Sequence, residues 1–346
     1  MAFETPAAVV DLDRLERNLR RWQTYCDEHG LANRPHVKTH RSVAIARLQL
    51  ELGAIGITCQ KLGEAEVMVD AGVEDVLVPY NLVGEAKLER LAALLLRARM
   101  TVSVDDEALL GGLSSAAVRA GRELAVLVDC DTGLGRTGVR TPNKAAELAA
   151  RVASASGLRF AGFLTYPAPE GAVAFLAAAA ADVRRRGLEV EVVSAGGTPG
   201  MWNAGGLAAT VTEYRAGTYA FFDRNSIAAG AATLVDVALT VRATVVSRPE
   251  PRLALLDAGS KALAADPGPD GGHGLVLEAR GSRIAKLNEE HAYVELAEGD
   301  QLELGQEVSV VPNHVCVVAN LFDRLWTERG GRVTGSWPVD ARGRSQ

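Results

Sequence analysis

The stretch Arg34-Pro35-His36-Val37-Lys38-Thr39-His40 predicts the first strand of the fold, over residues 34–38, and places a lysine at its end. A lysine whose stem is held on a strand and whose amine enters a pocket can be desolvated. Desolvation lowers the pKa of the amine and makes it a nucleophile toward carbonyls. A lysine just past a strand is more often an ordinary surface residue, so the interpretation of Lys38 depends on the rest of the chain.

Seven further β-rich runs come after it, and segments with a helical pattern separate most of them. The eight runs are residues 34–38, 56–60, 76–80, 101–105, 124–129, 160–166, 191–197 and 213–219. Short apolar strands that alternate with helices predict a parallel sheet covered by helices. Eight such units in roughly 200 residues predict an α/β fold of the (β/α)8 TIM-barrel type, with a doubly wound sheet as the alternative. We predict that this barrel domain spans residues 10–225.

The sequence pattern changes after about residue 225. The runs at 235–246, 252–257, 291–296 and 307–312 predict strands joined by Gly/Pro turns without helices between them. This pattern is typical of an antiparallel β-domain. The run at 7–13 is a candidate to pair with it. We therefore predict a second domain over residues 226–346 together with residues 1–9.

Composition excludes several classes of protein. Hydrophobic residues make up 48% of the 346 residues and charged residues 23%, as in soluble globular proteins. The net charge of −6 gives no basic surface for nucleic acid or an anionic membrane. Residues 1–13 lack the pattern of a secretory signal, and the apolar run at 91–96 is too short to span a bilayer. The four cysteines are widely separated, which favours reduced thiols and a cytoplasmic location.

The predicted strand ends carry the candidate site residues, because the functional site of a barrel lies at the C-terminal ends of its strands. Those ends hold Lys38, the segment 129–136, Tyr166, the segment 194–198 and the segment 215–219. Backbone N–H groups in a Gly-Gly-Thr turn can bind an anion, and a phosphate site after strands seven and eight is common in this fold. Such a turn alone is weak evidence. Together with the lysine it indicates a ligand with an aldehyde and a phosphate, pyridoxal 5'-phosphate (PLP).

Motifs along nearly the whole chain resemble the D-threonine aldolase / D-serine dehydratase family, fold-type III PLP enzymes related to the alanine racemases. The motifs are residues 34–42, 53–59, 61–64, 194–198, 257–261 and 312–316. The resemblance implies a barrel with a β-domain, a small amino-acid substrate and a homodimer.

The resemblance also implies roles for individual residues. Lys38 is implied as the Schiff-base lysine, Arg136 as the arginine at the cofactor face and Arg215 as the arginine near the pyridine nitrogen. The residues implied to hold the phosphate are Gly196, Gly197, Thr198, Gly217 and Thr218. Further candidates are His36 and Tyr166 for catalysis, and Ser194 and Tyr219 for cofactor binding.

His314 and Cys316 are the candidate metal ligands. They are two residues apart, so in a strand both side chains face the same way. Imidazole and thiolate are good ligands for Zn²⁺ and related metals, but an HxC pair alone is usually core packing. In the family the corresponding pair binds a divalent metal beside the cofactor, here Zn, Mn or Mg. An Asp at the second position resembles the aldolases, whereas Cys resembles the dehydratases.

The base that acts on a substrate hydroxyl is open. Aldolase relatives often carry a histidine shortly after the sixth strand, but residues 165–171 contain none. His36, His40, His291 and a metal-bound hydroxide are the candidates.

These observations predict a lyase that cleaves D-3-hydroxy-α-amino acids to glycine and an aldehyde, as D-threonine aldolases do. The alternative is a D-serine or D-3-hydroxyaspartate dehydratase that yields a 2-oxo acid and ammonia. An amino-acid racemase and a non-catalytic PLP-binding protein are further alternatives, and the candidate metal pair argues against both.

Overall fold

The computed structural model describes residues 3–346 and divides into two compact units. The barrel unit comprises Trp22–Lys38, Ile45–Gly217 and Arg344–Gln346. The β unit comprises the chain up to Arg21, Thr39–Ala44 and Thr218–Gly343. Residues 1–2, which the predicted second domain includes, lie outside the described residues, and the predicted domain boundaries stay a prediction.

Within the described chain, the barrel unit is built on an eight-stranded parallel sheet with the order β2-β9-β8-β7-β6-β5-β4-β3. Its strands are β2 (Ala32–Asn33), β3 (Ile57–Thr58), β4 (Asp75–Val78), β5 (Arg99–Val104), β6 (Leu124–Cys130), β7 (Leu158–Thr165), β8 (Val192–Ala195) and β9 (Glu213–Tyr214). A parallel bridge between His36 and Thr58 joins the two ends of this order, and the Thr58 N–H donates to Pro35 O at 2.8 Å. The sheet therefore closes, and the predicted (β/α)8 barrel is confirmed.

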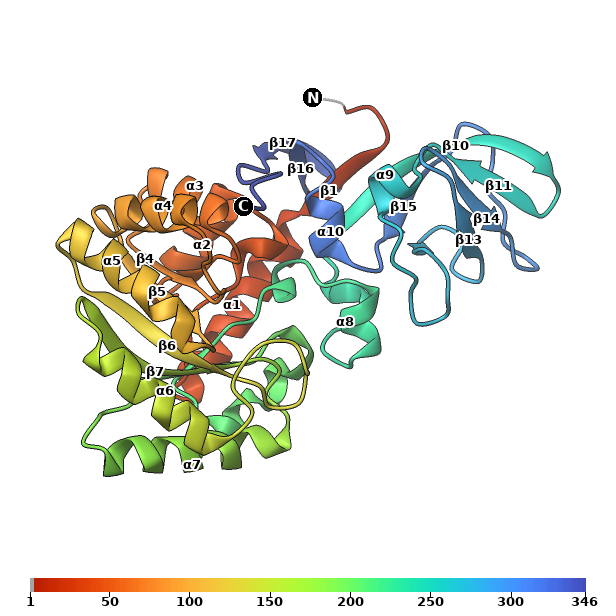
Figure 1. Ribbon diagram of the computed structural model, residues 1–346. Helices are drawn as coiled ribbons and strands as arrows, with labels where there is room; N and C mark the ends of the chain where they lie inside the picture. Colours follow the sequence, from red (N-terminus) through yellow and green to blue (C-terminus); the bar gives the residue numbers. More distant parts are fainter. Residues whose placement is uncertain (1–2) are drawn as a thin grey trace. The chain divides into compact units, whose positions relative to one another are not determined.

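Helices alternate with these strands and flank them on the outside (Figure 1). They are α1 (Leu12–Glu28), α2 (Val43–Glu51), α3 (Leu62–Asp70), α4 (Glu85–Leu95), α5 (Leu110–Ala120), α6 (Pro142–Ser154) and α7 (Glu170–Arg185), with the 3-10 helices η1 (Val37–Thr39), η2 (Glu107–Leu109) and η3 (Thr198–Leu207). Local sequence sets their ends: Thr141 caps α6 by accepting from the Lys144 N–H, and Gly121 ends α5 in the left-handed region.

The barrel strands are apolar almost throughout because both of their faces are buried. Leu77 on β4, Leu127 on β6 and Leu164 on β7 form a buried cluster with Ala161. This core fixes the strands, and with them the loops that follow their C-terminal ends.

Several predicted strands differ from the observed ones in their bounds. The predicted strand 34–38 is misplaced: β2 ends at Asn33, and residues 34–38 hold the isolated bridge at His36 and the start of the η1 turn that contains Lys38. Pro35 has no N–H to continue the ladder, although the Arg34 and His36 N–H groups still donate to Tyr214 O and Ala216 O. The predicted strand 213–219 is β9, which ends at Tyr214.

The β unit contains the predicted sheet. Its strands are β1 (Ala7–Asp11), β10 (Leu239–Glu250), β11 (Leu253–Leu256), β12 (Leu275–Val276), β13 (Arg283–Leu287), β14 (Ala292–Glu295), β15 (Glu307–Val311), β16 (Arg324–Arg329) and β17 (Arg332–Pro338), with α8 (Arg224–Ala228), α9 (Ser260–Leu263), α10 (Val315–Ala319), η4 (Thr218–Ala220) and η5 (Leu234–Asp236). β1 pairs antiparallel with β10, as anticipated for the run at 7–13. It also pairs with β16 in parallel, so the sheet is mixed rather than purely antiparallel.

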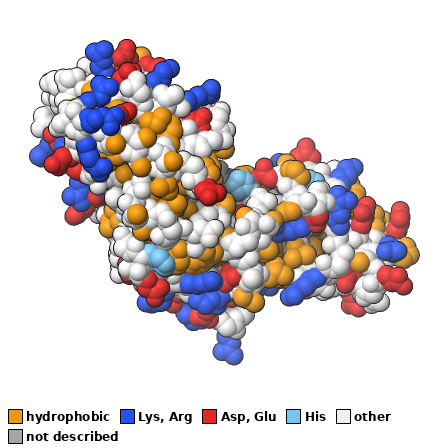
Figure 2. Space-filling view, turned by 90° about the horizontal axis from the view of Figure 1, so that it is seen from below, with side chains coloured by type: hydrophobic (Ala, Val, Ile, Leu, Met, Phe, Trp, Pro, Cys, Tyr) orange, Lys and Arg blue, Asp and Glu red, His pale blue; other side chains and the backbone are white. Residues whose placement is uncertain are grey.

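On the face seen in Figure 2, acidic and basic side chains are interspersed. No helix among residues 3–346 combines the length and the apolarity needed to cross a bilayer.

Candidate active site

Parallel strands of the barrel bring the predicted cofactor residues to one end of the sheet. Lys38 lies in the turn that follows β2, two residues after the bridge between His36 and Thr58. Ser194 lies near the end of β8 and Arg215 directly follows β9. The structure thus places these residues at the C-terminal strand ends, as the sequence predicts.

Arg215 is held by hydrogen bonds inside the barrel. Its guanidinium donates to Ser194 Oγ at 2.6 Å and to Thr165 O at 2.8 Å. Burial lowers the pKa of Arg215 to about 10, and the negative charges of Glu213 and Asp129 oppose this shift. Arg215 therefore stays charged at neutral pH, with its orientation fixed by groups on β7 and β8.

A chain of buried charges continues from Ser194 across the barrel. Ser194 Oγ donates to Glu213 Oε1 at 2.5 Å, and Glu213 Oε2 accepts from Arg34 Nε at 2.7 Å. Arg34 also donates to Asp75 at 2.6 Å. Because both charges of each pair are largely buried, these ion pairs constrain the strand ends on which Lys38 and Arg215 sit.

His36 is a neutral residue of this environment. Burial holds the pKa of His36 well below its usual range, and the positive charges of Lys38 and Arg215 lower it further. Its Nε2 lies 3.1 Å from Gln60 Oε1. An imidazole held neutral beside an amine adds no positive charge next to Lys38.

The loop after β8 has the shape of an anion cradle. Gly196 has φ of 79°, and a Cβ there would lie 2.0 Å from the Tyr214 ring. A Cβ on Gly197 would lie 2.6 Å from the Tyr166 ring. Within the described residues the N–H groups of Gly196 and Gly197 donate no hydrogen bond to the backbone. Only glycine fits at both positions, and N–H groups without a backbone acceptor suit a phosphate.

Tyr214 supports this loop from below. It is buried, and its hydroxyl donates to Gly197 O at 3.1 Å. Its ring packs edge-on against Trp22, with 5.4 Å between the ring centroids. The Gly217 N–H donates to Thr198 Oγ1 at 3.3 Å, which joins the two predicted phosphate segments.

Arg136 lies in a loop organised by Asp131. Asp131 Oδ1 accepts from the N–H groups of Gly133, Leu134 and Gly135, each at 3.0 Å, and these bonds hold the pKa of Asp131 below its usual value. The Arg136 guanidinium lies 5.8 Å from the centroid of the Tyr166 ring, a cation–π distance. The structure thus brings these two predicted residues together.

His314 and Cys316 lie close together at the start of a helix, not on a strand. β15 ends at Val311, His314 is the N-cap of α10 and Cys316 lies in its first turn. The prediction that both lie in a strand is wrong, because the chain turns into a helix after Pro312. The helical turn nevertheless brings the imidazole and the thiol close enough for each to shift the pKa of the other.

The two side chains shift each other's pKa in opposite directions. The hydrogen bond to Cys316 raises the pKa of His314 to about 9, helped by the negative charges of Asp223 and Asp266. Burial alone would raise the pKa of Cys316, but the hydrogen bond and charge of His314 outweigh it, and the net pKa is lowered.

Two threonine hydroxyls of the β unit also contact the Cys316 sulfur. Thr39 Oγ1 lies 3.3 Å and Thr218 Oγ1 3.5 Å from Sγ. Thr218, a predicted phosphate ligand, thus turns its hydroxyl toward Cys316. Tyr219 beside it is buried.

The other candidate histidines lie in different settings. His40 is fully buried, and its Nδ1 accepts from the Ser42 N–H at 3.1 Å. His291 is exposed in the turn between β13 and β14. Neither position identifies a base for a substrate hydroxyl.

The donor set at His314 and Cys316 fits a metal that keeps open coordination positions. Across residues 3–346, no group of three or more His, Cys, Asp or Glu side chains is arranged to hold a metal. An imidazole and a thiolate in contact supply two ligands that Zn²⁺ and similar ions accept. The remaining positions would be open to water and substrate.

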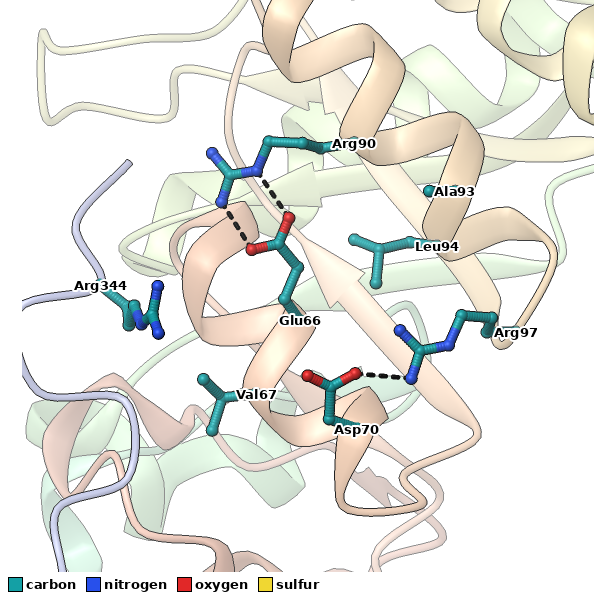
Figure 3. Close-up of a pocket in the computed structure, with 8 residues that line it drawn as sticks. All are labelled: Glu66, Val67, Asp70, Arg90, Ala93, Leu94, Arg97 and Arg344. Atoms are coloured by element: carbon teal, nitrogen blue, oxygen red, sulfur yellow. Dashed lines mark hydrogen bonds and ion pairs between the residues drawn. The ribbon is translucent and has the colours of Figure 1, made fainter.

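A pocket on the outside of the barrel unit does not compete with this site. It has a volume of about 280 Å³ and lies between α3 and α4 (Figure 3). Its charged groups are already paired, Glu66 with Arg90 at 2.6 and 2.8 Å and Asp70 with Arg97 at 2.6 Å. None of the strand-end residues lines it.

Family models match both parts of the chain. The alanine racemase N-terminal domain matches residues 10–225, and a putative serine dehydratase domain matches residues 238–327. The D-threonine aldolase of Arthrobacter sp is 36% identical over 99% of this chain and 94% of that protein. The chain belongs to the D-threonine aldolase / D-serine dehydratase family.

Other family members include both aldolases and dehydratases. The 3-hydroxy-D-aspartate aldolase of Paracoccus denitrificans is 36% identical over 99% of this chain and 93% of its own length. The crystal structure of D-threonine aldolase from Filomicrobium marinum matches with a TM-score of 0.90 and 38% identity, covering 99% of this chain and 97% of that one. As a member of this family, the chain is an enzyme of the lyase class.

A dehydratase structure bears on the HxC pair. D-threo-3-hydroxyaspartate dehydratase from Delftia sp. HT23 matches with a TM-score of 0.88 and 32% identity, covering 98% of each chain. Two further structures of a D-threo-3-hydroxyaspartate dehydratase have a histidine replaced by alanine and, in a metal-free form, a cysteine two positions later replaced by alanine. The spacing is the same as that of His314 and Cys316.

Proposed function

We propose that this protein is a PLP- and divalent-metal-dependent lyase that cleaves D-3-hydroxy-α-amino acids to glycine and an aldehyde, as a D-threonine aldolase does. The observation that carries the proposal is the contact of Thr39 Oγ1 with Cys316 Sγ at 3.3 Å, with His314 two residues before Cys316 at the start of α10. Thr39 directly follows Lys38, so the chain passes from the proposed cofactor lysine to a residue that touches a proposed metal ligand. A racemase needs no such pair.

The barrel residues fit the cofactor. PLP supplies an electron sink that weakens the bonds at the substrate Cα. Lys38 would hold it through its amine, and the N–H groups of Gly196 and Gly197 would bind the phosphate. Arg215 and Arg136 would bind its ring substituents or the substrate through their guanidinium groups. The buried ion pairs below them would keep these groups in place without rearrangement.

The HxC pair fits the metal. A divalent ion acts as a Lewis acid toward the β-hydroxyl of a substrate. Cys316 offers a thiolate and His314 offers an imidazole after loss of the proton that the pair shares, so metal binding would release a proton. Zn²⁺ suits a thiolate best, Mn²⁺ is the next candidate and Mg²⁺ is the least suited.

We assign His36 a positioning role rather than proton transfer. Its pKa is held low by burial and by two neighbouring cations, so it would not carry a proton at neutral pH. Its contact with Gln60 holds the segment that leads into Lys38.

Dehydration is the second candidate, and Cys316 is the observation that favours it. Metal coordination of a hydroxyl can stabilise the alkoxide for Cα–Cβ cleavage, or make the hydroxyl a better leaving group. A D-threo-3-hydroxyaspartate dehydratase carries a histidine and a cysteine at the same spacing. The geometry of the two ligands is compatible with either reaction.

Product analysis separates the two. The purified protein is incubated with D-threonine, D-3-hydroxyaspartate and D-serine, with metal and after its removal. Glycine plus an aldehyde supports the aldolase, whereas a 2-oxo acid plus ammonia supports the dehydratase. The L-enantiomers serve as controls, because a chiral site should reject them. Comparable rates on L- and D-threonine would refute the D-configuration. The homodimer and the cytoplasmic location stay predictions.

A further inference from the structure

A loop of the β unit brings a carboxylate to His314. Asp266 Oδ2 lies 3.4 Å from His314 Nδ1, an ion-pair distance slightly longer than an ordinary N–H···O hydrogen bond. Asp266 lies outside the strands and helices, in the segment between α9 and β12. It has no part in the chemistry proposed above, so its place beside the imidazole needs a reason.

Backbone contacts fix Asp266 relative to His314. Asn313, one residue before His314, donates from Nδ2 to Asp266 O and to Gly272 O, both at 2.8 Å. Gly268 also packs closely on Asn313, since a Cβ there would lie 2.6 Å from Asn313 Oδ1. The carboxylate is therefore anchored to the residue that precedes the imidazole it faces.

The segment that carries His314 is anchored from its other side. The Val315 N–H donates to Asp223 Oδ2 at 3.0 Å, and Arg224 donates to Asn313 Oδ1 at 2.9 Å. Asp266 can position the His314 imidazole only if both residues are themselves held in place. The hydrogen bonds above hold the segments that carry both of them.

The chemistry of metal-bound histidine gives Asp266 its role. An imidazole that binds a metal through one nitrogen usually donates the N–H of the other to a carboxylate, which fixes the tautomer and the ring orientation. We propose that Asp266 is the positioning residue for His314: its carboxylate accepts the Nδ1 proton and leaves Nε2 for the divalent metal. This inference rests on the proposed function, because it takes His314 as a metal ligand.

Direct ligation by Asp266 is the competing interpretation. It would give three protein ligands, whereas no three-residue cluster suited to a metal occurs in the part of the chain that the structure describes. The side chains of His314 and Asp266 are 42% and 46% exposed. Solvent therefore screens the contact, and its effect should fall at the lower end of the 10- to 100-fold range typical of such partners.

Co²⁺ binding to the full-length, PLP-loaded protein tests the proposal. The absorbance band from the Cys316 thiolate to cobalt gives both the Kd and the coordination of the saturated site. We expect Asp266→Ala to raise the Kd for Co²⁺ about tenfold while the saturated band and the PLP absorbance stay unchanged. Asp266→Glu should restore most of the affinity, because it returns a carboxylate.

Asp270→Asn is the matched control, a carboxylate of the same loop that pairs with Arg224 at 2.8 Å. It should leave the Kd within about twofold, below the range of a ligand-positioning partner.

Equal weakening of Co²⁺ binding by both variants would assign the effect to loop structure and overturn the proposal. An altered saturated band in Asp266→Ala would overturn it in favour of direct ligation. If the wild type binds Co²⁺ and Asp266→Ala binds it equally well, this inference alone fails. If the wild type binds no Co²⁺, the proposed metal site fails with it.

Discussion

The barrel unit and the β unit treat a histidine in opposite ways. Burial and the neighbouring cations Lys38 and Arg215 hold the pKa of His36 well below its usual range. A hydrogen bond to the Cys316 sulfur, with Asp223 and Asp266 nearby, raises the pKa of His314 to about 9. The same side chain is thus kept neutral in one unit and positively charged in the other.

The difference indicates which kind of ligand, an anion or a divalent cation, each environment suits. The barrel strand ends combine fixed cations with glycine N–H groups, an arrangement that attracts an anionic cofactor and keeps an imidazole from adding charge. The pair at α10 combines an imidazole with a thiol whose pKa is lowered, and a divalent cation can bind both once their protons leave. The first site is set by buried ion pairs, whereas the second is set by a short helix and a loop.

Replacing Lys38 tests the barrel side most severely. Lys38→Ala should reduce turnover by roughly six orders of magnitude or to background, because the amine that holds the cofactor is lost. Borohydride reduction of the wild type should fix PLP on Lys38, as peptide mass spectrometry would show. Lys61→Ala is the control and should still be labelled. A label found on Lys61 or Lys261 in the wild type would contradict the assignment.

Replacing Cys316 tests the β side. Cys316→Ala should lower metal-dependent cleavage on the order of 10³-fold, since a Lewis acid contributes several kcal/mol. The PLP absorbance should stay unchanged, because Lys38, Gly196, Gly197, Arg136 and Arg215 lie in the barrel unit. Cys316→Asp should restore metal binding and, if the second ligand selects the reaction, shift the product ratio toward glycine. Full turnover of Cys316→Ala after metal removal would exclude a role for the pair.

The buried ion pairs that set the barrel site can be weakened by a single isosteric substitution. Glu213→Gln removes the charge opposite Arg34, 2.7 Å away, and leaves that guanidinium partly uncompensated. We expect the free energy of unfolding to fall by about 3 kcal/mol. Glu191→Gln is the matched control at an exposed pair with Arg159, and it should cost about 1 kcal/mol or less. Equal losses in the two variants, measured by denaturant unfolding, would show that burial of the pair adds nothing.

Sequence patterns predicted the barrel and its strand-end residues better than the buried contacts that hold those residues in place. The alternation of strands and helices gave the fold class, and the strand ends gave Lys38, Ser194 and Arg215. Glu213 and Tyr214 lie in a predicted strand, but nothing in a strand pattern says which residue across the barrel each one meets. Those partners are far away in sequence: Glu213 pairs with Arg34 and Tyr214 packs on Trp22.

The metal pair illustrates the opposite case. The spacing of His314 and Cys316 suggested a contact for the wrong reason, since a strand was expected and a helix N-terminus was found. Residues two apart in the first turn of a helix can also meet. Asp266 had no sequence signal at all, because a loop carboxylate far away in the sequence is positioned only by the fold.

The loop below the proposed phosphate offers a smaller perturbation. Tyr214→Phe removes the hydrogen bond to Gly197 O while the ring that supports Gly196 remains. One hydrogen bond is worth about 1 kcal/mol, so PLP should bind the cofactor-free protein roughly fivefold more weakly. Tyr293→Phe, whose hydroxyl accepts from Asn288 in the β unit, should leave the Kd unchanged. The Kd is measured by titration of cofactor-free protein with PLP. An unchanged Kd for Tyr214→Phe would show that the Tyr214 hydroxyl does not contribute to PLP binding.

The smallest expected effect concerns the neutral histidine itself. The pKa of His36 is lower in the folded protein than in the unfolded chain, where it is about 6.5. At a pH between these two pKa values, His36 is protonated in the unfolded chain but not in the folded protein. The stabilisation due to His36 is therefore complete above pH 6.5 and is lost as the pH falls toward the folded pKa. The loss is at most about 1.4 kcal/mol per pH unit.

His36→Asn lacks the titrating ring. Subtracting its free energy of unfolding from that of the wild type cancels the contributions of all other titrating groups. Denaturant unfolding at several pH values between about 7 and 5 should therefore show wild-type stability falling relative to His36→Asn below about pH 6.5. A constant difference over that range would mean that His36 is protonated as easily in the barrel as in water, and the contrast with His314 would disappear.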